Sequence, residues 1–298
     1  LLLVMFAGDD AGGAQRWFEI GSFRFQPSEL AKILIILFFA YFFMKHEEKI
    51  NTPKVLILSF VLAGIPLALI LKQPDLSTTI VTALIFAALL FVAGLSYKIV
   101  TGVLAVSIPS AVIMFTLLIQ DKLPFIKSYQ VTRVMAWLYP DDYPADAYQQ
   151  QNSIMAIGSG QLWGKGLNNS SIASMKNGNF ISEPQTDFIF AVVGEELGFI
   201  GCVIVIVLLL LIVFECILIA KNAKDLGGRL ICCGMAALIG FQSFINICVT
   251  TGLMPNTGLP LPFVSYGLTS LMSLFIGLGL VLNVGLQARK YHGLGDIE

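Results

Sequence analysis

The chain has 298 residues and a formal net charge of −1, and only 12% of its residues are charged. A soluble globular domain carries about 25% charged residues, so this composition, with 56% hydrophobic residues, excludes an ordinary soluble protein. The apolar residues form blocks of roughly the 20 residues that a helix needs to cross a bilayer. The sequence therefore predicts an integral membrane protein.

Seven apolar blocks are long enough to span a membrane, and each must be helical because backbone groups cannot stay unpaired in hydrocarbon. In chain order they cover residues 29–45, 54–72, 76–95, 98–120, 188–220, 229–251 and 264–287. Residues 1–7 look like the end of an eighth helix, since the chain opens without Met, a charged segment or a cleavage site. We expect an all-α, polytopic helix bundle in which residues 1–298 form one membrane-embedded domain, truncated at its N-terminus.

The Lys and Arg residues of the short loops predict the orientation of this bundle. One set of loops, together with the C-terminal tail, contains nine of these cations, whereas the opposite set contains three. Because cytoplasmic loops are enriched in Lys and Arg, the first set and the C-terminus should be cytoplasmic. Residues 121–187 then form one large extracytoplasmic loop, the kind of segment that usually carries function on a rigid scaffold.

Several classes of site are not expected. All five cysteines lie in apolar spans, so an extracytoplasmic disulfide is not available. His46 and His292 lie near the cytoplasmic side and far apart in sequence, which disfavours a His or Cys metal site and a hydrolase triad on the outer side. The chain has no Walker-type glycine loop, so ATP hydrolysis is not expected.

Short polar motifs instead gather on the predicted outer side. They lie at residues 13–17, 26–29, 73–75, 129–133, 158–166, 183–187 and 261–267. A membrane protein with its polar residues on one side works there, on a molecule that arrives from that side or within that leaflet.

These motifs resemble the shape, elongation, division and sporulation family of RodA and FtsW. The resemblance rests on GAQRWFEIGSFRFQPSELAK, QPDLSTTI, SGQLWGKG, PQTDFIFAVVGEELG and LPFVSYG, which occur in the family's order over nearly the whole chain. The family has ten spans, of which this chain would hold the last seven and a remnant of the third. Ser77 and Leu268 stand where the family usually has glycine.

The resemblance implies a peptidoglycan glycosyltransferase of the bacterial cytoplasmic (inner) membrane. Its substrate would be lipid II, an undecaprenyl-pyrophosphate-linked disaccharide pentapeptide, together with the growing lipid-linked glycan. A class B penicillin-binding protein would crosslink the product. A divalent cation, Mg²⁺ or Mn²⁺, is expected with unassigned ligands; an organic cofactor or a nucleic acid partner is not.

The family's catalytic aspartate lies in the motif that here reads TDFIFA, which implies Asp187. The chemistry agrees with this assignment. The donor leaves as an α-linked pyrophosphate and the product bond is β, so one inverting displacement with one base for the acceptor hydroxyl suffices. The alternative is that Asp187 or Thr186 caps the helix that begins at Phe188, which is compatible with catalysis.

Cations near the outer side are candidates for holding the pyrophosphate, because a leaving group of this kind needs positive charge. These candidates are Arg133, Lys165, Arg16, Lys32 and Lys72. Arg133 is the first choice because it matches the family's loop arginine. The alternative for each is a solvated or snorkelling side chain.

Five further polar positions are candidates for a role in the site or in packing. Glu183 is a candidate for supporting the base or binding a metal, and it precedes a proline that favours extended backbone. Ser265 and Tyr266 could contact substrate or serve packing alone. Glu195 lies inside an apolar span, as does Glu196; a carboxylate there is costly, and we favour bonds to neighbouring helices or a wet cavity.

Two other functions fit parts of this pattern. A flippase for the lipid-linked precursor would share the bundle and the buried carboxylates, but it should place polar groups at mid-membrane or in broken helices. A noncatalytic scaffold for a transpeptidase would explain the bundle but not the motif-rich loop.

Overall fold

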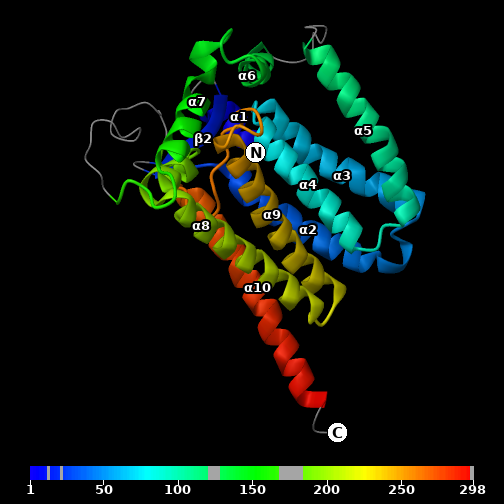
Figure 1. Ribbon diagram of the computed structural model, residues 1–298. Coiled ribbons are helices and arrows are strands. Elements are labelled where there is room, and N and C mark those ends of the chain that lie inside the picture. Colours follow the sequence, from blue (N-terminus) through cyan, green and yellow to red (C-terminus); the bar gives the residue numbers. More distant parts are fainter. Residues whose placement is uncertain (12–13, 21–22, 120–127, 168–183, 296–298) are drawn as a thin grey trace. The chain divides into compact units, whose positions relative to one another are not determined.

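The computed structural model describes residues 1–11, 14–20, 23–119, 128–167 and 184–295 (Figure 1). These residues are mostly helical, and they divide into two compact units. The first unit comprises Leu1–Ser96, Leu208–Ser243 and Tyr266–Glu298, and the second comprises Tyr97–Val207 and Phe244–Ser265.

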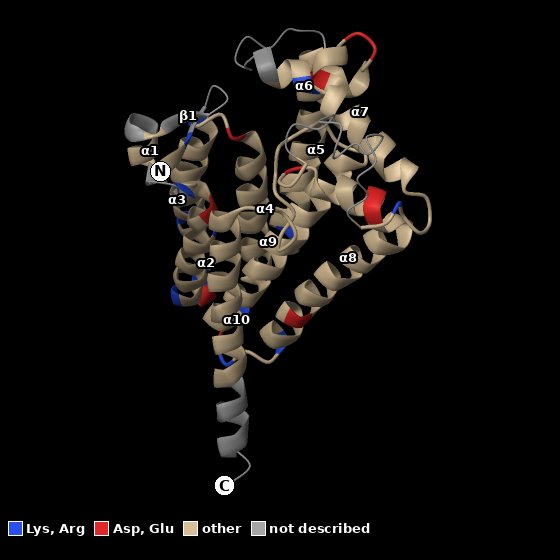
Figure 2. Cartoon of the chain, turned by 90° about the vertical axis from the view of Figure 1, so that its left-hand side faces the viewer, with Lys and Arg blue, Asp and Glu red and all other residues tan. Residues whose placement is uncertain are grey.

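The predicted helical membrane bundle is confirmed. Six described helices are long and apolar enough to cross a membrane, and a seventh apolar helix, α4, is shorter. They are α2 (Pro27–Lys45), α3 (Pro53–Lys72), α4 (Leu76–Val92), α5 (Tyr97–Ile119), α8 (Ile189–Lys221), α9 (Leu226–Thr250) and α10 (Leu268–Gly295). Each coincides with one predicted span, and charged side chains are sparse along them (Figure 2). The protein is thus a multi-pass membrane protein.

In the first unit, α2 packs against α4 and α10, and α3 packs against α4. Aromatic rings fill the space between α2 and α4, where the ring centroids of Phe39 and Phe86 lie 4.8 Å apart. The start of α4 is fixed by Asp75, whose carboxylate accepts a hydrogen bond of 3.0 Å from the backbone N–H of Thr78. This N-cap satisfies a donor that would otherwise be unpaired at the helix end.

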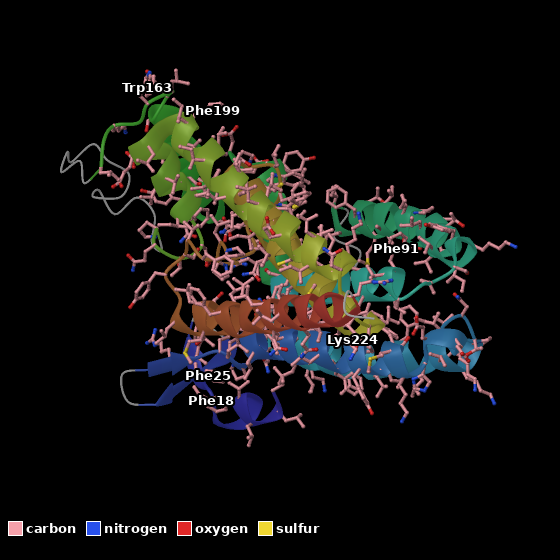
Figure 3. The ribbon with its side chains drawn as sticks, turned by 90° about the horizontal axis from the view of Figure 1, so that it is seen from below. Phe18, Phe25, Phe91, Trp163, Phe199 and Lys224 are labelled. Carbon is pink, nitrogen blue, oxygen red and sulfur yellow. The ribbon has the colours of Figure 1, made fainter. Side chains whose placement is uncertain are left out.

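The first unit also contains a short helix and three short strands. The helix α1 (Leu2–Ala7) lies where the end of an eighth helix was predicted. The apolar pattern did not predict the three antiparallel strands that follow it, β1 (Asp9–Ala11), β2 (Ala14–Ile20) and β3 (Phe23–Phe25). Phe18 of β2 pairs with Phe25 of β3, and Figure 3 labels both. β1 and β3 have only three residues each, which carry too little periodicity to be recognised in sequence.

The second unit shows that the long predicted loop is partly helical. It contains α6 (Ser128–Leu138) and α7 (Pro144–Ser159). Both helices are tied to the end of α9: Gln150 Nε2 donates to the carbonyl oxygens of Val249 and Met254 at 2.8 and 2.7 Å, and Trp137 Nε1 donates to that of Gly252 at 2.8 Å. These bonds hold α6 and α7 against the C-terminal end of α9 and the residues that follow it.

The span predicted at 188–220 is not one continuous helix. Gly198, inside α8, has a non-helical backbone with φ 66° and ψ −164°. The chain around Gly160–Gly166 fills this break: Lys165 N–H donates to Glu195 O at 2.9 Å, and Phe199 N–H donates to Gln161 O at 2.8 Å. A Cβ atom on Gly198 would lie 2.4 Å from the backbone nitrogen of Gly164. Glycine therefore permits both the positive φ and this close approach.

Candidate active site

Asp187 lies in a turn directly before α8, in the second unit. The residue is half-buried, and its carboxylate faces Gly258, in the segment that follows α9. A Cβ atom built on Gly258 would lie 3.1 Å from Asp187 Oδ2, and Gly258 has a φ of +68°. Any larger residue there would be strained and would press on the carboxylate. Gly258 thus lets the backbone pass close to the acid.

Two buried side chains connect the residues around Asp187 to this same segment. Asn246 Nδ2 donates to Asp187 O at 2.8 Å and to Leu259 O at 2.6 Å. Ser265 Oγ donates to Thr186 O at 2.5 Å and accepts a 2.7 Å hydrogen bond from the N–H of Leu261. The backbone at both Thr186 and Asp187 is therefore anchored, while Asp187 as a whole residue remains partly exposed.

Arg133, on α6, is exposed and belongs to the same unit as Asp187. Its Nη1 donates to Asn256 O, two residues before Gly258, at the long distance of 3.4 Å. The guanidinium therefore lies over the segment that passes the Asp187 carboxylate. A long bond to a carbonyl does not neutralise its charge, so it can still attract phosphate oxygens.

Lys165 lies on the segment that fills the break in α8, and its Nζ is 2.8 Å from Glu195 Oε1. The Glu195 side chain is 2% exposed and that of Lys165 is 30% exposed. The buried carboxylate thus has a cationic partner, and this partner comes from the loop rather than from a neighbouring helix. Trp163, on the same segment, and Phe199, after the break, are 77% and 64% exposed and point outward (Figure 3).

The other candidate cations lie in the first unit. Lys32 is 1% exposed, and its Nζ donates to Glu29 Oε1 and to Gln242 Oε1, both at 2.7 Å. Arg16 donates to the carbonyl oxygens of Gln73, at 2.8 Å, and Pro74. Lys72, in contrast, is exposed at the end of α3.

The remaining candidates are dispersed. Tyr266, in the first unit, is 76% exposed. Ser265 is 5% exposed and engaged with the backbone. Glu183 lies outside the described residues. Among the residues that the structure describes, no group of three or more His, Cys, Asp or Glu side chains could hold a metal ion.

Sequence reasoning missed three residues of these clusters: Gln242, Asn246 and Gly258. The first two are amide side chains inside the apolar helix α9, exposed by 0% and 1% respectively. Polar groups in a membrane span are costly and therefore informative, so this signal was available. The role of Gly258 depends on a contact with a residue distant in sequence, which no local pattern reveals.

The family model for cell cycle proteins of the FtsW, RodA and SpoVE type matches residues 1–290. A probable peptidoglycan glycosyltransferase FtsW of Geobacter sp. (strain M18) is 36% identical over 97% of this chain and 77% of its own length. The peptidoglycan glycosyltransferase MrdB of Escherichia coli (strain K12) is 37% identical over 95% of this chain and 74% of its own length.

Two solved structures resemble this one. A chain of a peptidoglycan synthase complex that coordinates polymerisation and crosslinking has a TM-score of 0.74 and 31% identity, covering 96% of this chain and 77% of that one. The rod shape determining protein RodA of Thermus thermophilus has a TM-score of 0.61 and 29% identity, covering 96% of this chain and 74% of that one.

Proposed function

This chain belongs to the FtsW, RodA and SpoVE family of cell cycle proteins and is a peptidoglycan glycosyltransferase, and we propose that it polymerises lipid II with Asp187 as the general base. The observation that supports this most directly is the anchored turn at Asp187. Its backbone is held from α9 and from Ser265, the residue is partly exposed, and its carboxylate lies beside Gly258. A base needs this combination of fixed position and access to the acceptor.

In the proposed reaction, the acceptor sugar's 4-hydroxyl attacks C1 of the donor sugar. A C1–O4 bond forms as the bond between C1 and the pyrophosphate oxygen breaks, and the configuration changes from α to β. The hydroxyl proton passes to the Asp187 carboxylate, and the electron pair of the broken bond leaves with the lipid pyrophosphate. One carboxylate is sufficient, because a pyrophosphate leaves without protonation when cations stabilise it.

Arg133 is the proposed contact for a pyrophosphate. It is exposed and lies in the same unit as Asp187, and its planar guanidinium can bind two phosphate oxygens at once. Lys165 is a second candidate in this unit, but its pairing with Glu195 also supports a role in holding the break in α8. The burial of Lys32 between Glu29 and Gln242 supports packing rather than contact with substrate.

A divalent cation, Mg²⁺ or Mn²⁺, remains part of the proposal. The described residues do not by themselves make a set of three acidic, His or Cys ligands, so they do not form a complete protein site for this ion. No step of the reaction above is assigned to it.

The expected setting of the reaction is the outer side of the bacterial cytoplasmic membrane, with the C-terminus of α10 on the cytoplasmic side. A class B penicillin-binding protein is the proposed partner. The structural match to a peptidoglycan synthase complex supports this pairing, because that complex combines polymerisation with crosslinking.

The decisive experiment is polymerisation of labelled lipid II by the purified full-length protein, with and without its partner. A glycosyltransferase yields a ladder of glycan chains on a gel, and the ladder should be lost in the Asp187→Asn variant. Transport of intact lipid II across vesicle membranes without any ladder would instead favour a flippase.

A further inference from the structure

We propose that Asn246 and Ser265 are positioning residues that set the place of the Asp187 carboxylate, with Gly258 as the surface against which it rests. This inference rests on the proposed role of Asp187 as base. It assigns to the motif around residues 254–267 a task in catalysis that does not involve touching substrate.

The hydrogen bonds of Asn246 are the first observation that supports this proposal. Its Nδ2 donates to two carbonyls from different segments, Asp187 O before α8 and Leu259 O after α9. Both partners are acceptors, so the amide nitrogen must face them and the orientation of the side chain is fixed. The other amide atom, Oδ1, is buried and has no hydrogen-bond partner among the residues that the structure describes. Leaving a buried acceptor unpaired is unfavourable, so the orientation of this side chain favours its two donor contacts.

Ser265 provides a second, independent connection between the same two segments. Its hydroxyl donates to Thr186 O and accepts from Leu261 N–H, at 2.5 and 2.7 Å. Thr186 and Asp187 are consecutive in the chain, and their contacts reach Leu259 and Leu261, which lie two residues apart in the facing segment. The two connections therefore hold two short stretches of backbone in fixed register.

Gly258 shows why this register affects the carboxylate. The α-hydrogen side of Gly258 faces Asp187 Oδ2, and even one added carbon would lie 3.1 Å from that oxygen. A shift of the segment by a few tenths of an ångström would therefore change the space available to the carboxylate. Since a misplacement of about 1 Å can cost on the order of 100-fold in rate, the register of this segment should control turnover.

The test uses the full-length protein and measures kcat and KM for lipid II. We expect Asn246→Ala and Ser265→Ala to lower kcat on the order of 10-fold or more, with KM changed by less than about twofold because uniform substrate binding is kept. Ser265→Thr retains the hydroxyl and should recover most of the rate. Thr251→Val, at the residue directly after α9, is the matched control, because the hydrogen bonds of the Thr251 hydroxyl go to the carbonyls of Ile247 and Cys248 in α9.

Gly258→Ala tests the same idea without removing any hydrogen bond, and it decides the matter if the other variants fail to fold. Its control is Gly94→Ala, because Gly94 also has a positive φ, +101°, but no atom of the described residues lies within 4 Å of an added Cβ. We expect kcat to fall for Gly258→Ala and to stay unchanged for Gly94→Ala.

The outcomes separate this inference from the proposed function. If Asp187→Asn is inactive but Asn246→Ala, Ser265→Ala and Gly258→Ala turn over like wild type, the positioning role is overturned and the base assignment stands. If the Ser265 and Asn246 variants raise KM with kcat unchanged, these residues act on substrate binding and the inference is also overturned. An active Asp187→Asn variant removes the base itself.

Discussion

Lys165 Nζ lies 2.8 Å from Glu195 Oε1 and so places a cation from the segment between α7 and α8 against a carboxylate inside an apolar helix. The same loop residue uses its backbone N–H to bond the carbonyl of Glu195 at 2.9 Å. Lys165 therefore pairs with the buried Glu195 carboxylate and also donates a backbone hydrogen bond to a carbonyl beside the break in α8. This double contact explains how a span containing a buried acid and a non-helical glycine can remain folded.

Breaking this pair from the cationic side should destabilise the protein. Lys165→Met leaves the Glu195 carboxylate buried at 2% exposure without its cation, which costs up to about 3 kcal/mol after allowance for the partial exposure of Lys165. Adding Glu195→Gln to Lys165→Met should restore most of the loss, because the charge is then removed as well. Thermal unfolding in detergent measures both effects, and equal stability of the single and double variants would contradict the pairing.

Asp187→Asn should abolish polymerisation while the protein stays folded and membrane-inserted. The substitution keeps the size of the side chain and removes the base, and the backbone bonds from Asn246 and Ser265 do not depend on the carboxylate. Glycan ladders from labelled lipid II measure the activity, and thermal unfolding checks the fold. Asp141→Asn is the control, since Asp141 is an exposed aspartate between α6 and α7 and should leave the ladder unchanged. A normal ladder from Asp187→Asn would remove this residue from the mechanism.

Arg133→Ala should raise the KM for lipid II, and Arg133→Lys should recover only part of the loss. The reason is that lysine keeps the charge but not the planar, two-pronged geometry that suits phosphate oxygens. Arg133 is exposed, so neither substitution should affect folding. Arg229→Ala, which removes an exposed arginine at the start of α9, is the control. Indistinguishable kinetics for wild type and both Arg133 variants would identify the side chain as merely solvated.

The membrane spans could be predicted from the sequence because a helix that crosses a bilayer needs a long apolar block. The blocks of α2 and α9, for example, can be recognised without knowing which helices pack against them. The break at Gly198 could not, since glycine is also frequent in unbroken membrane helices. Its meaning appears only when the backbone of Gln161 and Lys165 is seen to bond across it. Asp187 could be predicted from a sequence motif. The contacts of Asn246 are long-range hydrogen bonds, whose partners local sequence patterns do not encode.

Cysteine labelling should place α7 outside the cell and the end of α8 inside it. Gln151 on α7 and Asn222 after α8 are both exposed, so a cysteine at either position can react once the reagent reaches it. The predicted orientation rests on the short loops and the C-terminal tail, with nine cations in one set and three in the opposite set, and it puts only Gln151 outside. In intact spheroplasts a membrane-impermeant maleimide should therefore label Gln151→Cys, and it should label Asn222→Cys only after the membrane is opened. Background should be low, because four native cysteines are buried and Cys233 is partly buried. The reverse pattern would put Asp187 on the cytoplasmic side, away from an outward-growing glycan, and the proposed reaction would have to be abandoned.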